Sequence, residues 1–177
     1  MHKPATALKG IYRDVILNAE QEVIHDSGWT SNTIVDNCRI LLAGFMKGDG
    51  PLGIQHLAVG QGDAAWDDLD APPPSPPATI GLVNPYTDAF INVAPENIDY
   101  LDGSDDVQED PAPRLQITLT LDPGYPPPVG DTDFYPLREF GLFGQFGTTD
   151  FMINSIRHPV IHKDVAATLV RVIRLYF

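Results

Sequence analysis

Apolar residues follow a helical period most clearly between residues 29 and 62. Within this stretch they recur every three to four positions, at Ile34, Cys38, Leu41, Leu42 and Phe45. Thr33 and Asp36 have the spacing of a capping box, and Gly48 suits the left-handed residue that ends a helix. The pattern therefore predicts one amphipathic helix at roughly 33–47, with Leu41 and Leu42 buried against a sheet formed by the flanking segments.

Strand patterns occupy much of the remaining chain. Residues 114–121 alternate between apolar odd and polar even positions, which is typical of a half-buried strand. Residues 167–177 are apolar at both parities, which predicts a central strand covered on both faces, with Arg171 and Arg174 as charges that oppose aggregation. Further strands are predicted at 11–17, 22–26, 54–59, 89–93, 137–143 and 151–156. The predicted fold class is mainly β: an antiparallel β-sandwich with one amphipathic helix packed on it.

Two regions lack apolar periodicity. Residues 1–9 are interpreted as an arm, and residues 62–113 as mostly loop. Within the second region, 71–78 is proline-rich and favours polyproline II, as a stiff surface spacer or as a docking motif for an aromatic groove. We therefore expect a single domain, 1–177, with a long Pro-rich acidic loop inserted at about 62–113. A loop of this length is expected to be mobile or held by a neighbouring subunit.

Composition narrows the possible partners. The formal net charge is −13 with only 11 Lys and Arg residues, and no Lys/Arg cluster occurs, so neither nucleic acid nor an anionic membrane is an expected partner. Cys38 is the single cysteine, which excludes an intrachain disulfide, and its place on the helical stripe predicts a buried filler rather than a reactive thiol. The first residues contain no apolar signal segment, so we expect a soluble protein made in the cytosol.

Candidate binding motifs fail on their spacing. Gly60 and Gly62 form a GxG without the third glycine of a dinucleotide-binding turn. His158 and His162 could share a strand face, but Pro159 separates them and no further ligand lies nearby in sequence. An EF-hand-like spacing links Asp102, Ser104, Asp106, Gln108 and Asp110, but the glycine and the terminal glutamate that a calcium loop needs are missing. We therefore predict no cofactor-binding residue and no metal ligand.

Arg138 and Glu139 resemble an acid/base pair at first sight. Adjacent strand residues point to opposite faces, so the two side chains cannot share one site without a bulge. Nucleophile and phosphate-binding motifs do not occur in the chain. We therefore predict no catalytic residues and no enzymatic activity.

Three segments together resemble tailed-phage virion proteins of the tail-fibre, collar and baseplate type. Residues 10–36 are similar to a strand, a turn and a strand that lead into N-x-I-x-D and a helix. Residues 54–62 are similar to the I-x-x-(I/L)-A-V-G-x-G that follows that helix. Residues 138–143 are similar to the R-E-(I/F)-G-L-F of tail-fibre attachment domains, where a strand, a proline and a lysine such as Lys163 come next. The structural motif residues of these segments are Asn32, Asp36, Gly60, Gly62, Arg138, Glu139 and Gly141.

The resemblance implies a non-enzymatic structural protein. Such a protein links virion parts, as a collar, baseplate or fibre attachment component, through self-association and contacts with other virion proteins. It implies a homo-oligomer that is assembled in the host cytoplasm and located in the virion. A carbohydrate- or calcium-dependent β-sandwich binding module is the alternative, and a small hydrolase with dispersed carboxylates is a third possibility.

Overall fold

The computed structural model describes residues 8–127 and 134–177, so most of the expected arm at 1–9 lies outside the described residues. Twelve strands form one antiparallel sheet in the order β5-β4-β9-β11-β3-β1-β12-β8-β6-β7, with β10 on β9 and β2 on β1. The strands are β1 Lys9–Leu17, β2 Val23–Asp26, β3 Thr30–Ile34, β4 Leu52–Gly60, β5 Pro85–Asn92, β6 Ile98–Leu101, β7 Val107–Gln108, β8 Arg114–Leu121, β9 Phe134–Phe146, β10 Thr149–Met152, β11 Asn154–Asp164 and β12 Thr168–Tyr176. The helical elements are α1 Asp36–Lys47 and the short 3-10 turns η1 Ala64–Asp68 and η2 Pro95–Asn97.

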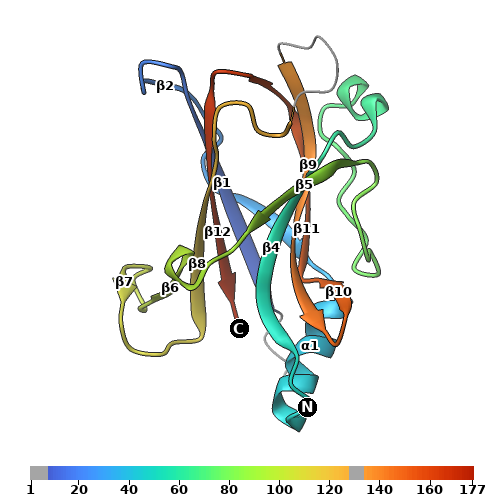
Figure 1. Cartoon of the computed structure of the whole chain (residues 1–177), viewed down its shortest axis with the longest axis vertical. Helices are drawn as coiled ribbons and strands as arrows, with labels where there is room; N and C mark the ends of the chain where they lie inside the picture. Colours follow the sequence, from blue (N-terminus) through green and yellow to red (C-terminus); the bar gives the residue numbers. More distant parts are fainter. Residues whose placement is uncertain (1–7, 128–133) are drawn as a thin grey trace.

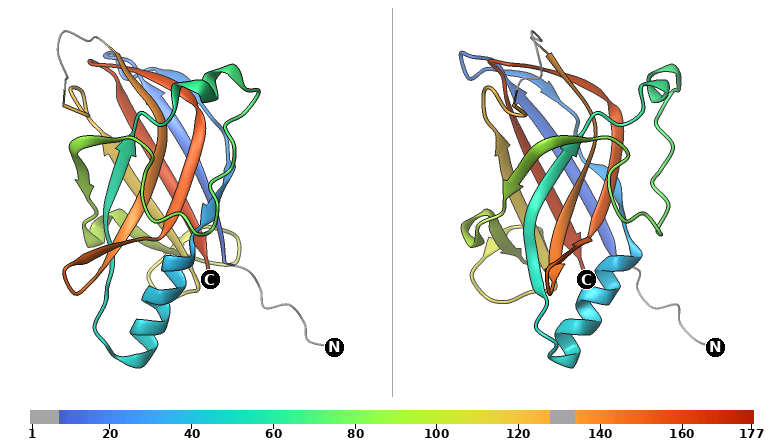
Figure 2. Two further views of the ribbon diagram at one scale, coloured as in Figure 1. Left: turned by 90° about the vertical axis from the view of Figure 1, so that its right-hand side faces the viewer. Right: turned by 45° about the vertical axis from the view of Figure 1, so that its right-hand side comes forward.

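The sheet bends into two facing layers, with β1, β12 and β8 on one side and β4, β9 and β11 on the other (Figure 1). The short strand β3 joins the layers, because it pairs with both β1 and β11. Helix α1 lies at one end of the molecule, beside the C-terminus (Figure 2). The predicted mainly β, antiparallel, sandwich-like fold with one packed α-helix is confirmed. No helix in the described part of the chain is long and apolar enough to cross a membrane.

The core fills the space between the layers, and strand alternation determines which residues enter it. On β12 the odd positions Leu169, Ile173 and Leu175 are buried, whereas the even positions from Val170 to Tyr176 are half-buried. The strand pairs with β1 on one side and β8 on the other, so its predicted central place in the sheet is confirmed. Arg171, however, shares the inward parity and is fully buried. Its expected role as an exposed charge is therefore wrong.

Helix α1 begins later than the capping pattern predicts. Residues 30–34 form β3, which leaves Val35 as the N-cap without a side-chain cap. The predicted Thr33–Asp36 capping box is thus wrong, because strand pairing takes these residues out of the helix. The predicted C-terminus is confirmed, since Gly48 has φ 80° and the left-handed conformation.

The predicted apolar stripe of α1 is buried only along part of its length. Leu41 is 3% exposed and Cys38 4%, so both predicted positions are confirmed. Leu42 is only half-buried and Phe45 is 48% exposed, so the stripe extends beyond the sheet that covers it. The cause is the position of α1 at the end of the molecule, where the sheet covers one flank of the helix.

Residues 62–113 carry more structure than predicted. β5, which overlaps the predicted strand 89–93, pairs with β4, and β6 pairs with β8. Each strand buries one large residue, Tyr86 in β5 and Leu101 in β6. Single anchors of this kind leave no periodic signal, which explains why the sequence predicts a loop. The irregular part is shorter, at 61–84, and it contains η1.

Candidate functional site

Two charged motif residues lie next to each other on β9 and hold a single loop. Arg138 donates from Nε and Nη2 to the two carboxylate oxygens of Asp67, at 2.8 and 2.6 Å. Its Nη1 donates to the carbonyl of Gln61 at 2.9 Å. Arg138 is only 7% exposed, whereas the Asp67 carboxylate reaches the surface, so one side of this bidentate pair is open to water. The Arg138 guanidinium accordingly holds the pKa of Asp67 below its usual range.

Glu139 binds the other end of the same loop. Its carboxylate accepts hydrogen bonds from the backbone amides of Val83, at 2.9 Å, and Asn84, at 2.7 Å. The residue is 1% exposed. The two loop ends also bond to each other, because the Gln61 amide donates to the Asn84 carbonyl at 2.8 Å. We call Arg138 and Glu139 the clasp of loop 61–84.

The backbone of β9 departs from strict alternation at the clasp. Leu137 and Phe140 both belong to the core although two residues, an even number, lie between them. Opposite them, the register of β11 shifts between Arg157 and Ile161. This irregularity is the bulge that the sequence argument required before Arg138 and Glu139 could act together. They act on one loop rather than on one ligand.

Gly60, the last residue of β4, and Gly62, on loop 61–84, make room for the clasp. Gly60 pairs with Glu139, and a Cβ on Gly60 would lie 2.6 Å from Oε1 of that carboxylate. Gly62 has φ +60°, and a Cβ there would lie 2.6 Å from the Trp66 ring and 2.9 Å from Cβ of Arg138. The G-x-G and R-E segments are therefore parts of one structural unit. Sequence reasoning predicted each segment but not their contact.

The other motif residues lie elsewhere. A Cβ on Gly141 would lie 2.9 Å from the backbone oxygen of Asn154, which explains the glycine in β9. Asn32, on β3, packs against Gly10, and its amide atoms have no hydrogen-bond partner among the described residues. Asp36 is exposed at the start of α1. The structure thus brings together Gly60, Gly62, Arg138 and Glu139 and leaves Asn32, Asp36 and Gly141 apart from them.

Loop 61–84 crosses the outer side of β11 (Figure 2). Near its start, the Arg157 guanidinium lies 4.8 Å from the centroid of the Trp66 ring. The same guanidinium donates to the carbonyl of Pro73 at 3.2 Å. Trp66 is 9% exposed as a result of this packing. These contacts pack the loop on its own chain, and the expectation that it is mobile or held by a neighbouring subunit stays a prediction.

The proline-rich segment 71–78 continues along the same surface to α1. Ser75 is buried and its hydroxyl lies 2.7 Å from that of Ser155 on β11. Two residues later, the carbonyl of Pro77 accepts the amide of Asp36 at 2.8 Å. A backbone group from the loop therefore caps the N-terminus of α1 in place of the predicted side chain. Most of segment 71–78 is exposed, as a stiff surface spacer would be, and its role as a docking motif stays a prediction.

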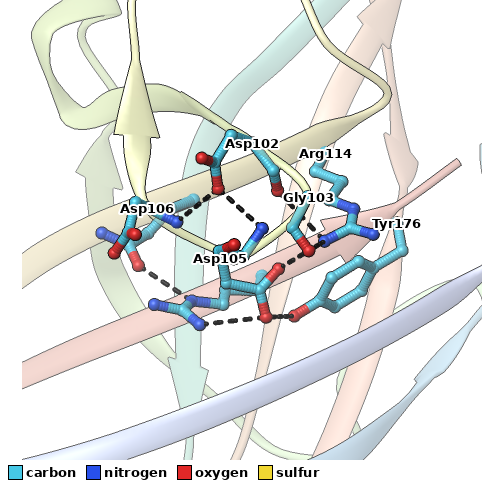
Figure 3. A network of polar contacts seen from close by, with 9 residues as sticks. Asp102, Gly103, Asp105, Asp106, Arg114 and Tyr176 are labelled. Atoms are coloured by element: carbon cyan, nitrogen blue, oxygen red, sulfur yellow. Dashed lines mark hydrogen bonds and ion pairs between the residues drawn. The ribbon is translucent and has the colours of Figure 1, made fainter.

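The acidic loop after β6 is tied to the sheet by a polar network (Figure 3). Asp102 Oδ1 accepts the amides of Ser104, at 2.7 Å, and Asp106, at 3.0 Å, and these hydrogen bonds lower the pKa of Asp102. Asp105 pairs with Arg114 at 3.0 Å and Arg174 at 3.4 Å. Two backbone amides thus occupy Oδ1 of Asp102, which belongs to the EF-hand-like spacing, whereas Asp105 with its two arginines lies outside that spacing.

The two histidines considered as metal ligands do not come together. His158 is 3% exposed in the core, whereas His162 is exposed on the same strand. The register of β11 shifts between Arg157 and Ile161, so the two histidine side chains do not share one face of the strand. Among the described residues, no cluster of three His, Cys, Asp or Glu side chains could hold a metal ion.

A buried polar group that the sequence did not predict lies in the core. Arg171 forms a bidentate ion pair with Asp14, and its guanidinium carbon lies 3.3 Å from the centroid of the Phe140 ring. His158 Nε2 lies 3.4 Å from Nη2 of Arg171. Burial, and then the Arg171 charge, lower the pKa of His158 to about 4. The sequence contained one signal for this buried pair. Asp14 and Arg171 lie at the alternate strand positions that otherwise carry buried apolar residues.

An apolar hollow of about 430 Å³ opens beside α1. Its walls come from α1 and from residues in or next to β4, β6, β8, β11 and β12: Cys38, Leu41, Leu42, Phe45, Gly53, Ile54, Pro95, Ile98, Asp99, Tyr100, Leu115, Ile153, Leu175 and Phe177. Ile153 and Leu175, at 5% and 2% exposure, are among its buried floor residues, whereas Tyr100 and Phe177 are exposed at 38% and 45%. The hollow can hold apolar groups and offers little to a charged ligand.

No protein-family model, curated protein or solved structure matches this chain. The functional proposal therefore rests on the contacts of the clasp and on the exposed apolar side chains around the hollow.

Proposed function

We propose that this chain is a non-enzymatic structural component of a phage or phage-like particle. It resides in the virion and links parts of the particle, as a collar, baseplate or fibre attachment protein, through self-association and contacts with other virion proteins. The observation that carries the proposal is the exposed apolar surface at the α1 end of the molecule. The resemblance of three segments to tail-fibre, collar and baseplate proteins supports the kind of particle.

The apolar end has the character of a protein-binding surface. Large apolar side chains are exposed on α1, at the start of β4, on β6 and at the C-terminus: Ile40, Phe45, Met46, Leu52, Tyr100 and Phe177. Three of these, Phe45, Tyr100 and Phe177, also line the hollow. Contiguous apolar patches on a soluble protein mark sites of protein association. This end is therefore the best-supported place for a contact within a particle.

The motif residues support a structural rather than a chemical role. Arg138 and Glu139 make their hydrogen bonds to the protein's own loop. A general acid or base needs to reach a substrate proton, and both side chains are at least nine-tenths buried under loop 61–84. Their role is to hold the loop against the sheet.

The alternative of a calcium-dependent binding module has less support. Asp102 already accepts two backbone amides, and Asp105 already pairs with two arginines. A cation that used Oδ1 of Asp102 would have to compete with these two amides. No observation on the described residues favours a carbohydrate site.

The test is the location of the protein in particles. Particles from the source that encodes this chain should contain it at a constant copy number by quantitative mass spectrometry. Gold-labelled antibody should mark one locus on each particle. Deleting the gene should give particles that lack the neighbouring part. Complete particles without any copy of the chain would overturn the proposal.

A further inference from the structure

The hollow beside α1 is unlike the rest of the surface in its charge. The whole chain has a net charge of −13, but of the described residues that line the hollow only Asp99 is charged. On α1 and its C-terminal flank, Asp36 pairs with Arg39 at 3.3 Å and Lys47 pairs with Asp49 at 2.8 Å. The acidic and basic charges of residues 36–49 therefore balance. A second copy therefore meets no net charge on residues 36–49, although the whole chain is acidic.

The side chain that fits such a hollow lies directly beside it. Met46 is 91% exposed, the largest exposed fraction among the exposed large apolar residues of the described chain. It follows Leu42, a lining residue, by one helical turn, so the two side chains lie on the same flank of α1. Methionine is flexible and fills irregular apolar spaces well. The molecule thus presents a projecting apolar side chain and an apolar recess next to each other.

We propose that the hollow receives Met46 of a second copy of this chain, so that two copies pair through their α1 ends around a two-fold axis. In such a pairing each Met46 enters the other copy's hollow, and both features are covered at once. A different partner would fill the recess and leave Met46 in water unless it carried a recess of its own. The pairing specifies the self-association of the proposed function and rests on it.

Two variants test the projection and the recess separately. Met46→Glu places a charge on the projecting side chain, and its 91% exposure means that the fold is not disturbed. Gly53→Leu fills the recess, because Gly53 lines the hollow and the nearest atom to a Cβ there is Phe45 Cζ at 3.9 Å. Sedimentation velocity over a concentration series should show a wild-type dimer. Each variant should raise the dissociation constant on the order of tenfold or more.

Matched controls lie on loop 61–84, outside the residues that line the hollow. Ile80→Glu adds a charge at a residue that is 73% exposed. Gly81→Leu adds the same side chain as Gly53→Leu at a position with no atom within 4 Å of a Cβ. Both control proteins should dimerise as the wild type does. Circular dichroism melts establish that all four variants are folded.

Several results would overturn the pairing. These are a wild-type monomer at every concentration, a Gly53→Leu protein that dimerises normally, and control variants that dissociate as readily as Met46→Glu. A monomer whose hollow binds a neutral apolar dye such as N-phenyl-1-naphthylamine would show a small-molecule pocket instead. A monomer that is nevertheless found in particles refutes the pairing and leaves the proposed function intact. A dimer that occurs in no particle refutes the proposed function and leaves the pairing intact.

Discussion

Asp14 and Arg171 face each other on paired strands, with Nε of the arginine 2.7 Å from Oδ1 and Nη2 2.8 Å from Oδ2 of the aspartate. They are 157 residues apart in sequence and are 1% and 0% exposed. A bidentate pair in the core compensates part of the large cost of removing two charges from water. Strands β1 and β12 are therefore joined by side chains as well as by their backbones.

Removing one partner of this pair should destabilise the protein strongly. Asp14→Ala leaves the Arg171 charge buried, which should lower the free energy of unfolding by about 3–5 kcal/mol. The double variant Asp14→Leu with Arg171→Met replaces both charges by apolar side chains and should regain most of that loss. Urea denaturation of the three proteins measures the difference. A double variant that is no more stable than Asp14→Ala would contradict this account.

The buried His158 should make stability depend on pH in the mildly acidic range. Its pKa is lowered from 6.5 to about 4, so between these values the unfolded chain binds a proton that the folded protein does not. The free energy of unfolding should be highest above about pH 6.5 and should fall by on the order of 3 kcal/mol as the pH drops to about 4. Below that pH this group causes no further loss.

His158→Gln isolates this effect, because a glutamine does not titrate. Burial also lowers the pKa of His56, but that residue is present in both proteins and its contribution cancels in the difference. Urea denaturation at a series of pH values should give a shallower decline for the variant than for the wild type. Parallel curves for the two proteins would show that His158 is not the group responsible.

The clasp should control the exchange of two backbone amides. Glu139→Gln removes a charge and leaves one side-chain oxygen for the amides of Val83 and Asn84. Local opening of loop 61–84 should become easier by about 1.5–3 kcal/mol, and both amides should exchange hydrogen faster. Glu96→Gln, an exposed residue in η2, should leave them unchanged. Unaltered exchange in Glu139→Gln would mean that the loop is held without the clasp.

The packing of α1 depends on Leu41. This residue is 3% exposed, so Leu41→Ala should lower the free energy of unfolding by about 2–5 kcal/mol. Ile40→Ala on the same helix is a suitable control, because Ile40 is 50% exposed and should cost much less. Thermal melts followed by circular dichroism measure both. A melting curve unchanged by Leu41→Ala would show that α1 contributes little to the fold.

The last six residues should be required for folding. Deleting 172–177 removes much of β12, which pairs with β1 and β8 on its two edges. Both neighbours would lose hydrogen bonds, and Ile173 and Leu175 would leave the core. Removing Phe177 alone should be tolerated, because it lies beyond β12 and is 45% exposed. Circular dichroism would refute this prediction if the longer deletion retained a cooperative melt.

Local periodicity was sufficient where one face of an element meets the core. The alternation of 114–121 predicts β8 at its observed bounds, Arg114–Leu121. The turn chemistry of Gly48 likewise predicts the end of α1, since a left-handed residue is a property of the local backbone. The class of fold follows from such patterns. These features depend on neighbours that are close in sequence, and the sequence by itself therefore determines them.

Tertiary contacts decided where β3 and α1 begin, how the clasp forms and which charges are buried. Residues 30–34 became β3 because two distant strands pair with them, and Pro77 caps the helix that begins at Asp36. Gly60 and Gly62 make room for Arg138 and Glu139, and they can do so only because β4 lies beside β9. Arg171 enters the core because Asp14, far away in sequence, compensates its charge there. No local pattern records that compensation, since the free energy of a buried charge depends on which partner the fold places beside it.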